Sequence, residues 1–137
     1  MRIERFEDLR VYQDSFEATM RIFEASKEWP ESEKYSLTDQ VRHSSRSVCA
    51  NISEAWFKRS YSKYFASKLN DSISEAAETV TWLRFADRCG YMQSDAAQSP
   101  QEEYRKIIGG LVKVITQSEK WCDNNRLREP PAPYEPD

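Results

Sequence analysis

Residues 1–129 of this chain contain very few helix-breaking residues, and that scarcity constrains the fold more than any other feature. The whole sequence has only three glycines, and four of its six prolines lie at positions 130, 131, 133 and 136. All-β folds place glycine or proline at most of their turns, whereas long helices exclude both residues from their interiors. We therefore expect an all-α protein. With 137 residues, the chain is long enough for one domain with a substantial core.

Apolar residues recur at spacings of three and four in four successive segments, which is the pattern of helices with one buried side. The connections between the segments are short, and helices joined in this way pack as neighbours that run in alternate directions. We therefore predict an antiparallel, up-down-up-down four-helix bundle as one domain, 1–124. A proline-rich tail, 125–137, is expected to be flexible. The predicted helices span roughly 8–28, 37–58, 61–89 and 100–123.

Residues with capping preferences define the expected helix ends. Ser36 and Ser60 are expected to cap the second and third helices, because serine oxygens accept hydrogen bonds from free backbone N–H groups. Gly90 stands where a left-handed residue would end the third helix. Ser99 and Pro100 supply a cap and a proline for the first turn, so the start of the fourth helix is the clearest boundary in the sequence.

The first helix carries two adjacent apolar rows, which together are wider than the single seam of a bundle. One row is Leu9, Tyr12, Phe16, Thr19 and Phe23, and the other is Val11, Ser15, Ala18, Ile22, Ala25 and Trp29. Large apolar and aromatic side chains left over after a core is filled are typical of a subunit interface. The alternative is a thick intramolecular core with some exposed aromatic residues. The candidate oligomer-interface residues are Val11, Ile22, Trp29, Trp56 and Trp82.

Charge is distributed unevenly along the chain. The net charge of −3 disfavours a protein that coats nucleic acid or anionic lipid with its whole surface. Residues 36–63, however, hold five basic and two acidic residues, together with Tyr61 and the adjoining Tyr64, and this combination suits phosphate contacts and base stacking. The alternative is an ordinary solvated face, or one that complements the acidic first helix of the same or a neighbouring subunit. The candidate nucleic-acid-binding residues are Arg42, Arg46, Lys58, Arg59 and Lys63.

The sequence lacks the residue sets on which catalysis depends. Four-helix bundles that hold two iron ions use paired Glu-x-x-His motifs, but this chain has one histidine, His43, preceded at the third position by Gln40. The same histidine would have to serve any nucleophilic cysteine, and Gly109 with Gly110 follows no strand that would make a phosphate-binding loop. We therefore expect no catalytic residue, no cofactor and no metal, and we predict that the protein is not an enzyme.

Asn51 and Glu54 form a candidate polar motif, because they lie three positions apart on one side of the second helix. Their neighbours on that helix include small residues that allow another helix to approach closely. One interpretation makes the pair a ligand or metal contact. The other makes both residues structural hydrogen-bonding partners within the bundle.

The cysteine pattern and the hydropathy bear on the compartment. Cys49, Cys89 and Cys122 are far apart and odd in number, which is typical of free thiols in a reducing compartment. No segment approaches the roughly 20 apolar residues of a membrane span, and the N-terminal residues have no apolar signal-peptide core. We therefore expect a cytoplasmic protein that does not interact with membranes.

Three segments of the chain resemble a known family. Together these matches spread over most of residues 6–120. They are Phe6-Glu7-Asp8-Leu9-x-Val11-Tyr12-Gln13, Tyr35-Ser36-Leu37-x-x-Gln40-Val41-Arg42-x-Ser44-Ser45-x-Ser47-Val48, and Asn51-Ile52-Ser53-Glu54-Ala55. In their order and spacing they resemble the bacterial four-helix-bundle family whose genes were first noticed in intervening sequences of 23S ribosomal RNA genes. One departure is Ala55, followed by Trp56, where the family's Asn-Ile-Ala-Glu-Gly block has glycine.

The resemblance implies a small cytosolic bundle that assembles as a homopentamer and has no known enzymatic activity. It also implies a relationship to the accessory proteins of diversity-generating retroelements, which are basic pentamers that bind nucleic acid and a reverse transcriptase. Only Asn51 and Glu54 carry over from the family's block. Our leading hypothesis is a non-enzymatic homo-oligomeric scaffold or adaptor. The alternative is an accessory protein that binds RNA or DNA, or a protein partner such as a reverse transcriptase, through the basic patch on the second helix.

Overall fold

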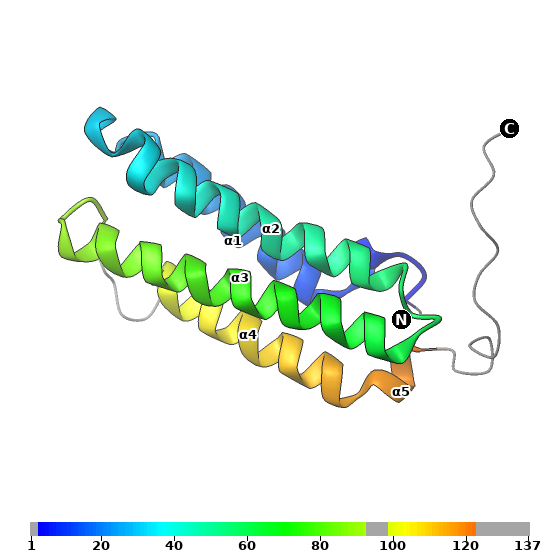
Figure 1. Cartoon of the computed structure of the whole chain (residues 1–137). Coiled ribbons are helices and arrows are strands. Elements are labelled where there is room, and N and C mark those ends of the chain that lie inside the picture. The colour runs from blue at the N-terminus through cyan, green and yellow to red at the C-terminus, as the bar shows by residue number, and fades with distance from the viewer. Residues whose placement is uncertain (1–2, 93–98, 123–137) are drawn as a thin grey trace, which may run out of the picture.

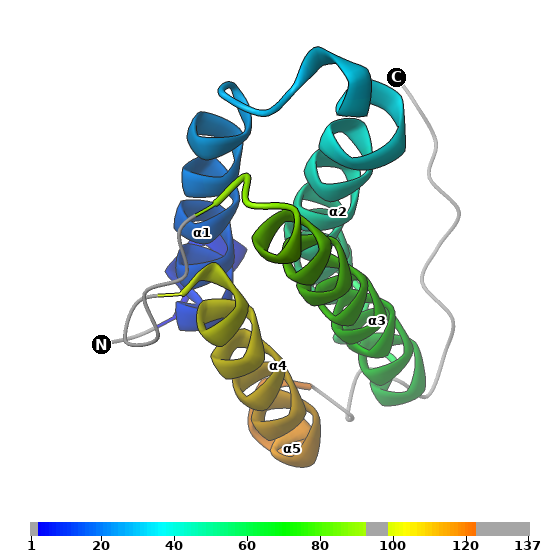
Figure 2. The same ribbon diagram turned by 90° about the vertical axis from the view of Figure 1, so that its left-hand side faces the viewer.

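The computed structural model describes residues 3–92 and 99–122, which form a bundle of four long helices (Figure 1). Figure 2 looks along the bundle and shows these helices at four corners, with α1 beside α2 and α4, and α3 diagonally across from α1. Each helix contacts the two neighbours in this ring, and the contact between α2 and α3 is the most extensive. The predicted all-α, up-down-up-down bundle is confirmed. The long helices are α1 (Arg10–Ser26), α2 (Asp39–Trp56), α3 (Ser62–Arg88) and α4 (Pro100–Thr116).

The first three helices begin and end within two residues of their predicted limits. The fourth departs more, because Gln117 leaves helical geometry and a separate short helix, α5 (Ser118–Trp121), follows it. The connection between α1 and α2 is also more regular than expected. It contains a 3-10 turn, Glu31–Glu33, and a π-helical turn, Lys34–Thr38. The predicted flexible tail, 125–137, lies outside the described residues.

Two of the four expected caps are present. Ser99 accepts a hydrogen bond from the Gln101 N–H at 3.2 Å, with Pro100 in the first turn. Gly90 adopts a φ of 79°, and the Tyr91 N–H bonds back to the Ala86 carbonyl at 2.9 Å, as in a left-handed helix ending. The expected caps Ser36 and Ser60 were wrong. The Ser36 hydroxyl donates to the Glu33 carboxylate instead, and α3 starts after Tyr61 without a side-chain cap.

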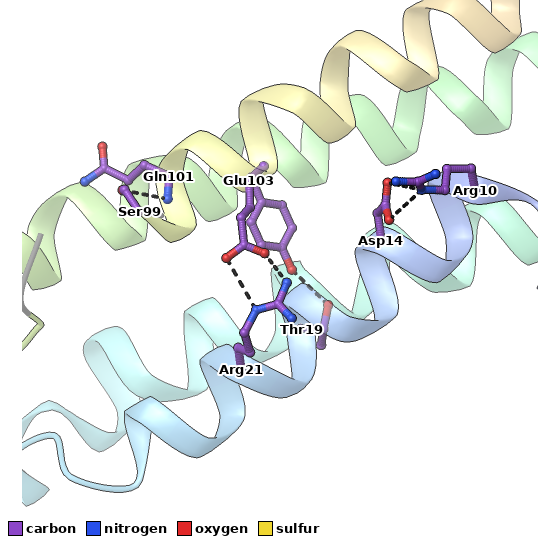
Figure 3. Close-up of polar contacts among 8 residues, drawn as sticks. Arg10, Asp14, Thr19, Arg21, Ser99, Gln101 and Glu103 are labelled. Carbon is purple, nitrogen blue, oxygen red and sulfur yellow. Dashed lines mark hydrogen bonds and ion pairs between the residues drawn. The ribbon is translucent and has the colours of Figure 1, made fainter. Parts of the chain in front are cut away.

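Small polar residues fix the packing inside the bundle. The hydroxyls of Ser44 and Thr79 bond across the α2–α3 contact at 2.8 Å, and the Ser72 hydroxyl donates to the Val48 carbonyl at 2.8 Å. On the opposite side, the fully buried Tyr104 of α4 meets Thr19 of α1, with 2.9 Å between their hydroxyl oxygens (Figure 3). Because unpaired buried hydroxyls are unfavourable, these bonds favour one register of the four helices.

The glycines of α4 provide a matched test of the α1–α4 contact. A Cβ added at Gly109 meets nothing within 4 Å, whereas one at Gly110 would lie 2.9 Å from Cγ1 of Val11. We expect Gly109→Ala to raise the free energy of unfolding by about 0.5–1 kcal/mol through helix propensity. In Gly110→Ala, displacement of Val11 should offset that gain. Urea unfolding of both variants measures the difference, and equal stabilisation would contradict the close contact.

Candidate functional site

The five candidate nucleic-acid-binding residues lie in two separate groups. Arg42 and Arg46 are near the start of α2, whereas Lys58, Arg59 and Lys63 are at the corner between α2 and α3. At a rise of 1.5 Å per residue, the twelve positions from Arg46 to Lys58 correspond to roughly 18 Å. The sequence predicted that these side chains form one basic patch. The structure instead places them in two separate groups.

Arg42 has a structural role at the end of α1. Its Nε donates to the Ser26 hydroxyl at 2.9 Å, and its Nη2 lies 3.5 Å from the Phe23 carbonyl oxygen. Its guanidinium also lies over the Phe23 ring, 4.8 Å from the centroid. A cation beside the last carbonyls of a helix stabilises its partially negative end, so Arg42 joins α2 to α1. Arg46, which is exposed, lies 5.7 Å above the same ring.

The corner between α2 and α3 combines cations with aromatic rings. The Arg59 guanidinium lies 3.4 Å from the centroid of the Trp56 ring, and its Nε donates to the Trp56 carbonyl at 2.7 Å. Tyr61 and Tyr64 pack edge to face at 5.6 Å, and 61% of Tyr64 is exposed. Lys58 and Lys63 are exposed in the same segment. We define the basic corner as Lys58, Arg59, Tyr61, Lys63 and Tyr64.

Asn51 and Glu54 form separate structural contacts. The Asn51 side-chain amide donates to the Ser47 carbonyl of its own helix at 2.9 Å. The Glu54 carboxylate forms an ion pair with Lys68 of α3 at 2.8 Å, and this contact raises the Lys68 pKa. The two side chains therefore have different partners, on different helices. The geometry favours the structural interpretation of this motif.

Four of the five candidate interface residues are part of the bundle's own core, which corrects the prediction from the sequence. Val11, Ile22, Trp29 and Trp56 are all buried, and only Trp82 is partly accessible, beside the exposed Phe85. The row that contains Val11 and Ile22, which the sequence suggested for a subunit interface, therefore faces the interior of the bundle. Its small members Ser15 and Ala18 were the available signal, since small side chains permit the close packing found inside a bundle.

Tyr12, Phe16 and Phe23 of the other row form, with Met20, an accessible apolar surface beside α2, whereas Leu9 and Thr19 of that row are buried. Phe16 and Met20 are 46% and 42% exposed, and Phe57 at the end of α2 is 74% exposed. The rings form a chain of contacts, with centroid separations of 6.0 Å from Phe16 to Tyr12, 5.0 Å from Tyr12 to Phe6 and 6.1 Å from Phe6 to Phe57. We define the aromatic face as Phe6, Tyr12, Phe16, Met20, Phe23 and Phe57.

The exposed side of α3 carries a different pattern. Four residues at intervals of seven positions, which is close to two helical turns, lie along its outward side and are all exposed. The middle two are acidic, and the outer two are aromatic. Their outward direction follows from the buried positions of the same helix, which include Phe65, Leu69, Ala76 and Leu83. We define the acidic stripe as Tyr64, Asp71, Glu78 and Phe85.

Several titratable groups lie outside these surfaces. Among the described residues, no three His, Cys, Asp or Glu side chains converge on a point where a metal ion could bind. His43 is exposed on α2, and it acts electrostatically on Glu75 of α3, whose pKa is raised mainly by burial. Burial also raises the pKa of the Cys49 and Cys122 thiols, which makes them weaker nucleophiles at neutral pH.

No helix in the described parts of the chain is long and apolar enough to cross a bilayer. The cysteines described, Cys49, Cys89 and Cys122, are all free thiols.

Comparisons with known proteins agree with this architecture. A model of the 23S rRNA-intervening sequence protein family matches residues 7–113. The chain is also similar to a crystal structure of a protein with unknown function from the S23 ribosomal protein family of Bacteroides thetaiotaomicron VPI-5482. The two chains share 30% identity with a TM-score of 0.68, over 77% of this chain and 95% of that one. No curated protein matched the chain. The α5 helix and the tail lie beyond the family match.

Proposed function

Because this chain belongs to the 23S rRNA-intervening sequence protein family, we propose that it acts as a non-enzymatic, homo-oligomeric scaffold or adaptor in the cytoplasm. The aromatic face is the observation that carries this proposal. It joins apolar side chains of α1 to Phe57 after α2, although a core for these helices already exists beneath it. Exposed apolar patches of this kind mark interaction surfaces, and aromatic residues and methionine are enriched there.

The partner that best fits the aromatic face is a second copy of the chain. Arg46 lies next to the aromatic face through its contact with Phe23, and it has no acidic partner among the described residues. The acidic stripe offers two carboxylates between two exposed rings. Contact between the two surfaces would therefore pair apolar with apolar groups and place Arg46 near Asp71 or Glu78.

The two surfaces are different, so the contact would be heterologous. A head-to-tail contact between unlike surfaces generates a closed ring when the rotation between subunits allows closure. Rings of this type accommodate odd numbers of subunits, and the family resemblance described above implies five. The scaffold would then present the remaining surfaces of each bundle in a fixed, repeated arrangement.

Light scattering across the micromolar range tests the assembly. We expect a constant mass that is a multiple of the 16.1 kDa chain, with five copies as the proposed number. A mass of 16.1 kDa throughout the range would overturn the proposed scaffold.

Nucleic-acid binding is a second candidate, and the basic corner is the feature that favours it. Its lysines are exposed beside the Tyr61–Tyr64 pair, which suits phosphate contacts with base stacking. Arg42 contributes little to this function, because its guanidinium is engaged by α1. RNA, DNA or a nucleoprotein such as a reverse transcriptase complex would be the partner.

Charge reversal at the basic corner tests this second function. If the corner binds single-stranded RNA, Lys58→Glu combined with Lys63→Glu should abolish retention at low salt. With two or three phosphates contacted, the logarithm of the binding constant should fall with that of the salt concentration with a slope of about −1.5 to −2. Lys27→Glu with Lys34→Glu, at the other end of the bundle, is the matched control. Equal loss in both double variants would remove the corner as the binding site.

A further inference from the structure

A groove lies where α1 begins and α4 and α5 end. It has a volume of about 780 Å³. Its floor is apolar and includes Leu9, Val11, Ile107 and Val114, with the indoles of Trp56 and Trp121 also in its lining. The aromatic face and the groove both use α1 and the end of α2, but no residue of the aromatic face lines the groove, so the groove is a separate surface.

A row of lysines borders the groove. Lys106 and Lys113 lie seven positions apart on one side of α4, and Lys120 of the separate helix α5 lines the same groove. All three are exposed, and none has an ion-pair partner among the described residues. Asp14 on the opposite wall is paired with Arg10 at 3.1 Å, and Asp8 accepts backbone N–H bonds from the preceding turn (Figure 3 shows the first pair). The groove therefore favours an anionic, elongated occupant.

Trp121 adds a hydrogen-bonding requirement in the groove. Its indole N–H is buried and has no acceptor among the described residues. Buried N–H groups without an acceptor are rare, because desolvation of the unpaired group is unfavourable. The orphaned donor lies one residue before Cys122, the last described residue. A carbonyl from the chain that follows would satisfy it.

We propose that residues 129–137 of this chain fold back and bind in this groove. Their sequence is Glu-Pro-Pro-Ala-Pro-Tyr-Glu-Pro-Asp, with three acidic residues and no basic residue. Proline-rich segments adopt an extended conformation with little entropic cost, and they bind in grooves lined by aromatic side chains. The acidic residues pair with the lysine row while the prolines and Tyr134 lie over the apolar floor.

The geometry of the chain allows this binding. Seven positions separate Cys122 from Glu129, and an extended chain spans roughly 3.3 Å per residue, so the segment can reverse direction and reach the groove. The seven positions from Lys113 back to Lys106 cover roughly 11 Å of α4, and Lys120 lies beyond them on α5. Nine residues in an extended proline-rich conformation cover roughly 28 Å, at about 3.1 Å each, which exceeds the span of the two α4 lysines.

Neither of the other segments outside the described structure fits as well. Residues 1–2 include Arg2, which the lysine row would repel. Residues 93–98 connect α3 to the start of α4, at the opposite end of the bundle from Trp121. The charge of the groove and its position beside Cys122 therefore select the C-terminal segment.

Backbone order parameters of the tail in the full chain test the proposal. The amides of Ala132, Tyr134 and Glu135 should give values above about 0.6, the limit below which backbone counts as flexible, at low salt. In the Lys106→Glu/Lys113→Glu variant they should fall below that limit, because both attractive charges become repulsive. High salt should have the same effect on the unmodified chain by screening the ion pairs.

The control is Lys27→Glu/Lys34→Glu, which changes net charge equally at the far end of the bundle and should leave the tail ordered. Because Lys106 and Lys113 are exposed, the bundle should remain folded in the test variant, and circular dichroism verifies this. Values below about 0.6 in the unmodified chain would overturn the proposal. Values that stay high in Lys106→Glu/Lys113→Glu would overturn it as well.

Discussion

Phe16→Asp is expected to separate the assembly into 16.1 kDa subunits while each subunit remains folded. Phe16 is 46% exposed in the subunit, so a carboxylate there is hydrated as long as the subunit is alone. In a subunit contact the same carboxylate would be buried without a partner, which costs about 3–5 kcal/mol. Since about 1.4 kcal/mol corresponds to a factor of ten, subunit affinity should fall about 100-fold or more. Light scattering measures the resulting mass.

The matched control for this variant is Val112→Asp. Val112 lies on α4, away from the aromatic face, and is also 46% exposed. The same charge introduced there should leave the mass of the assembly unchanged. If Val112→Asp separated the subunits and Phe16→Asp did not, α4 rather than α1 would hold the interface.

Tyr104→Ala should have the largest effect on stability, because Tyr104 is the largest fully buried side chain. Removal of its ring creates a cavity between α1 and α4, for which we expect a loss of about 3–5 kcal/mol. Tyr104→Phe should lose only about 1 kcal/mol. It removes the 2.9 Å bond to Thr19, but the Thr19 hydroxyl can still donate to the Ser45 carbonyl at 3.1 Å. Urea unfolding separates the two contributions, and equal losses would contradict the packing described.

The pH dependence of the unfolding free energy, compared between the wild type and Tyr104→Phe, provides a second test of the buried Tyr104 hydroxyl. Burial raises the pKa of the Tyr104 phenol above its ordinary value of 10.0 in the folded protein. The stability contributed by this neutral phenol is therefore fully present below about pH 10 and is lost as the pH rises toward the folded-state pKa. The difference in unfolding free energy between the wild type and Tyr104→Phe should shrink above about pH 10. Tyr91, whose hydrogen bond to Glu33 raises its pKa to about 12, affects both proteins alike.

The sequence predicted the bundle because its strongest local signals agree with the tertiary packing. The spacing of apolar residues located each long helix, and the motifs in the first two helices identified the family, which the family model confirms. Ser99 and Gly90 were informative because each satisfies backbone groups within its own turn. The end of α4 at Gln117 was missed, since its side chain neither breaks nor caps a helix.

The candidate surfaces were harder to predict because they depend on which side of a helix is buried. On α1 the two apolar rows are adjacent, and only the packing of α2 and α4 decides that Val11 and Ile22 face inward while Phe16 faces outward. Similarly, five basic residues within residues 42–63 suggested one patch, but a helix separates such residues along its axis. The structural role of Arg42 could not be predicted from the sequence, because its contacts with Ser26 and Phe23 join residues that are far apart in the chain.

The oxidation rate of Met20 tests the central claim that the aromatic face is a subunit interface. Met20 lies one turn beyond Phe16 and is 42% exposed in the subunit, so peroxide should reach its sulfur when the face is open. In the wild type the neighbouring subunit should cover it, and mass spectrometry should show oxidation several times slower than in Phe16→Asp. Met92, partly buried beyond the end of α3, serves as the internal reference. Equal Met20 oxidation rates in the wild type and in Phe16→Asp would contradict the account.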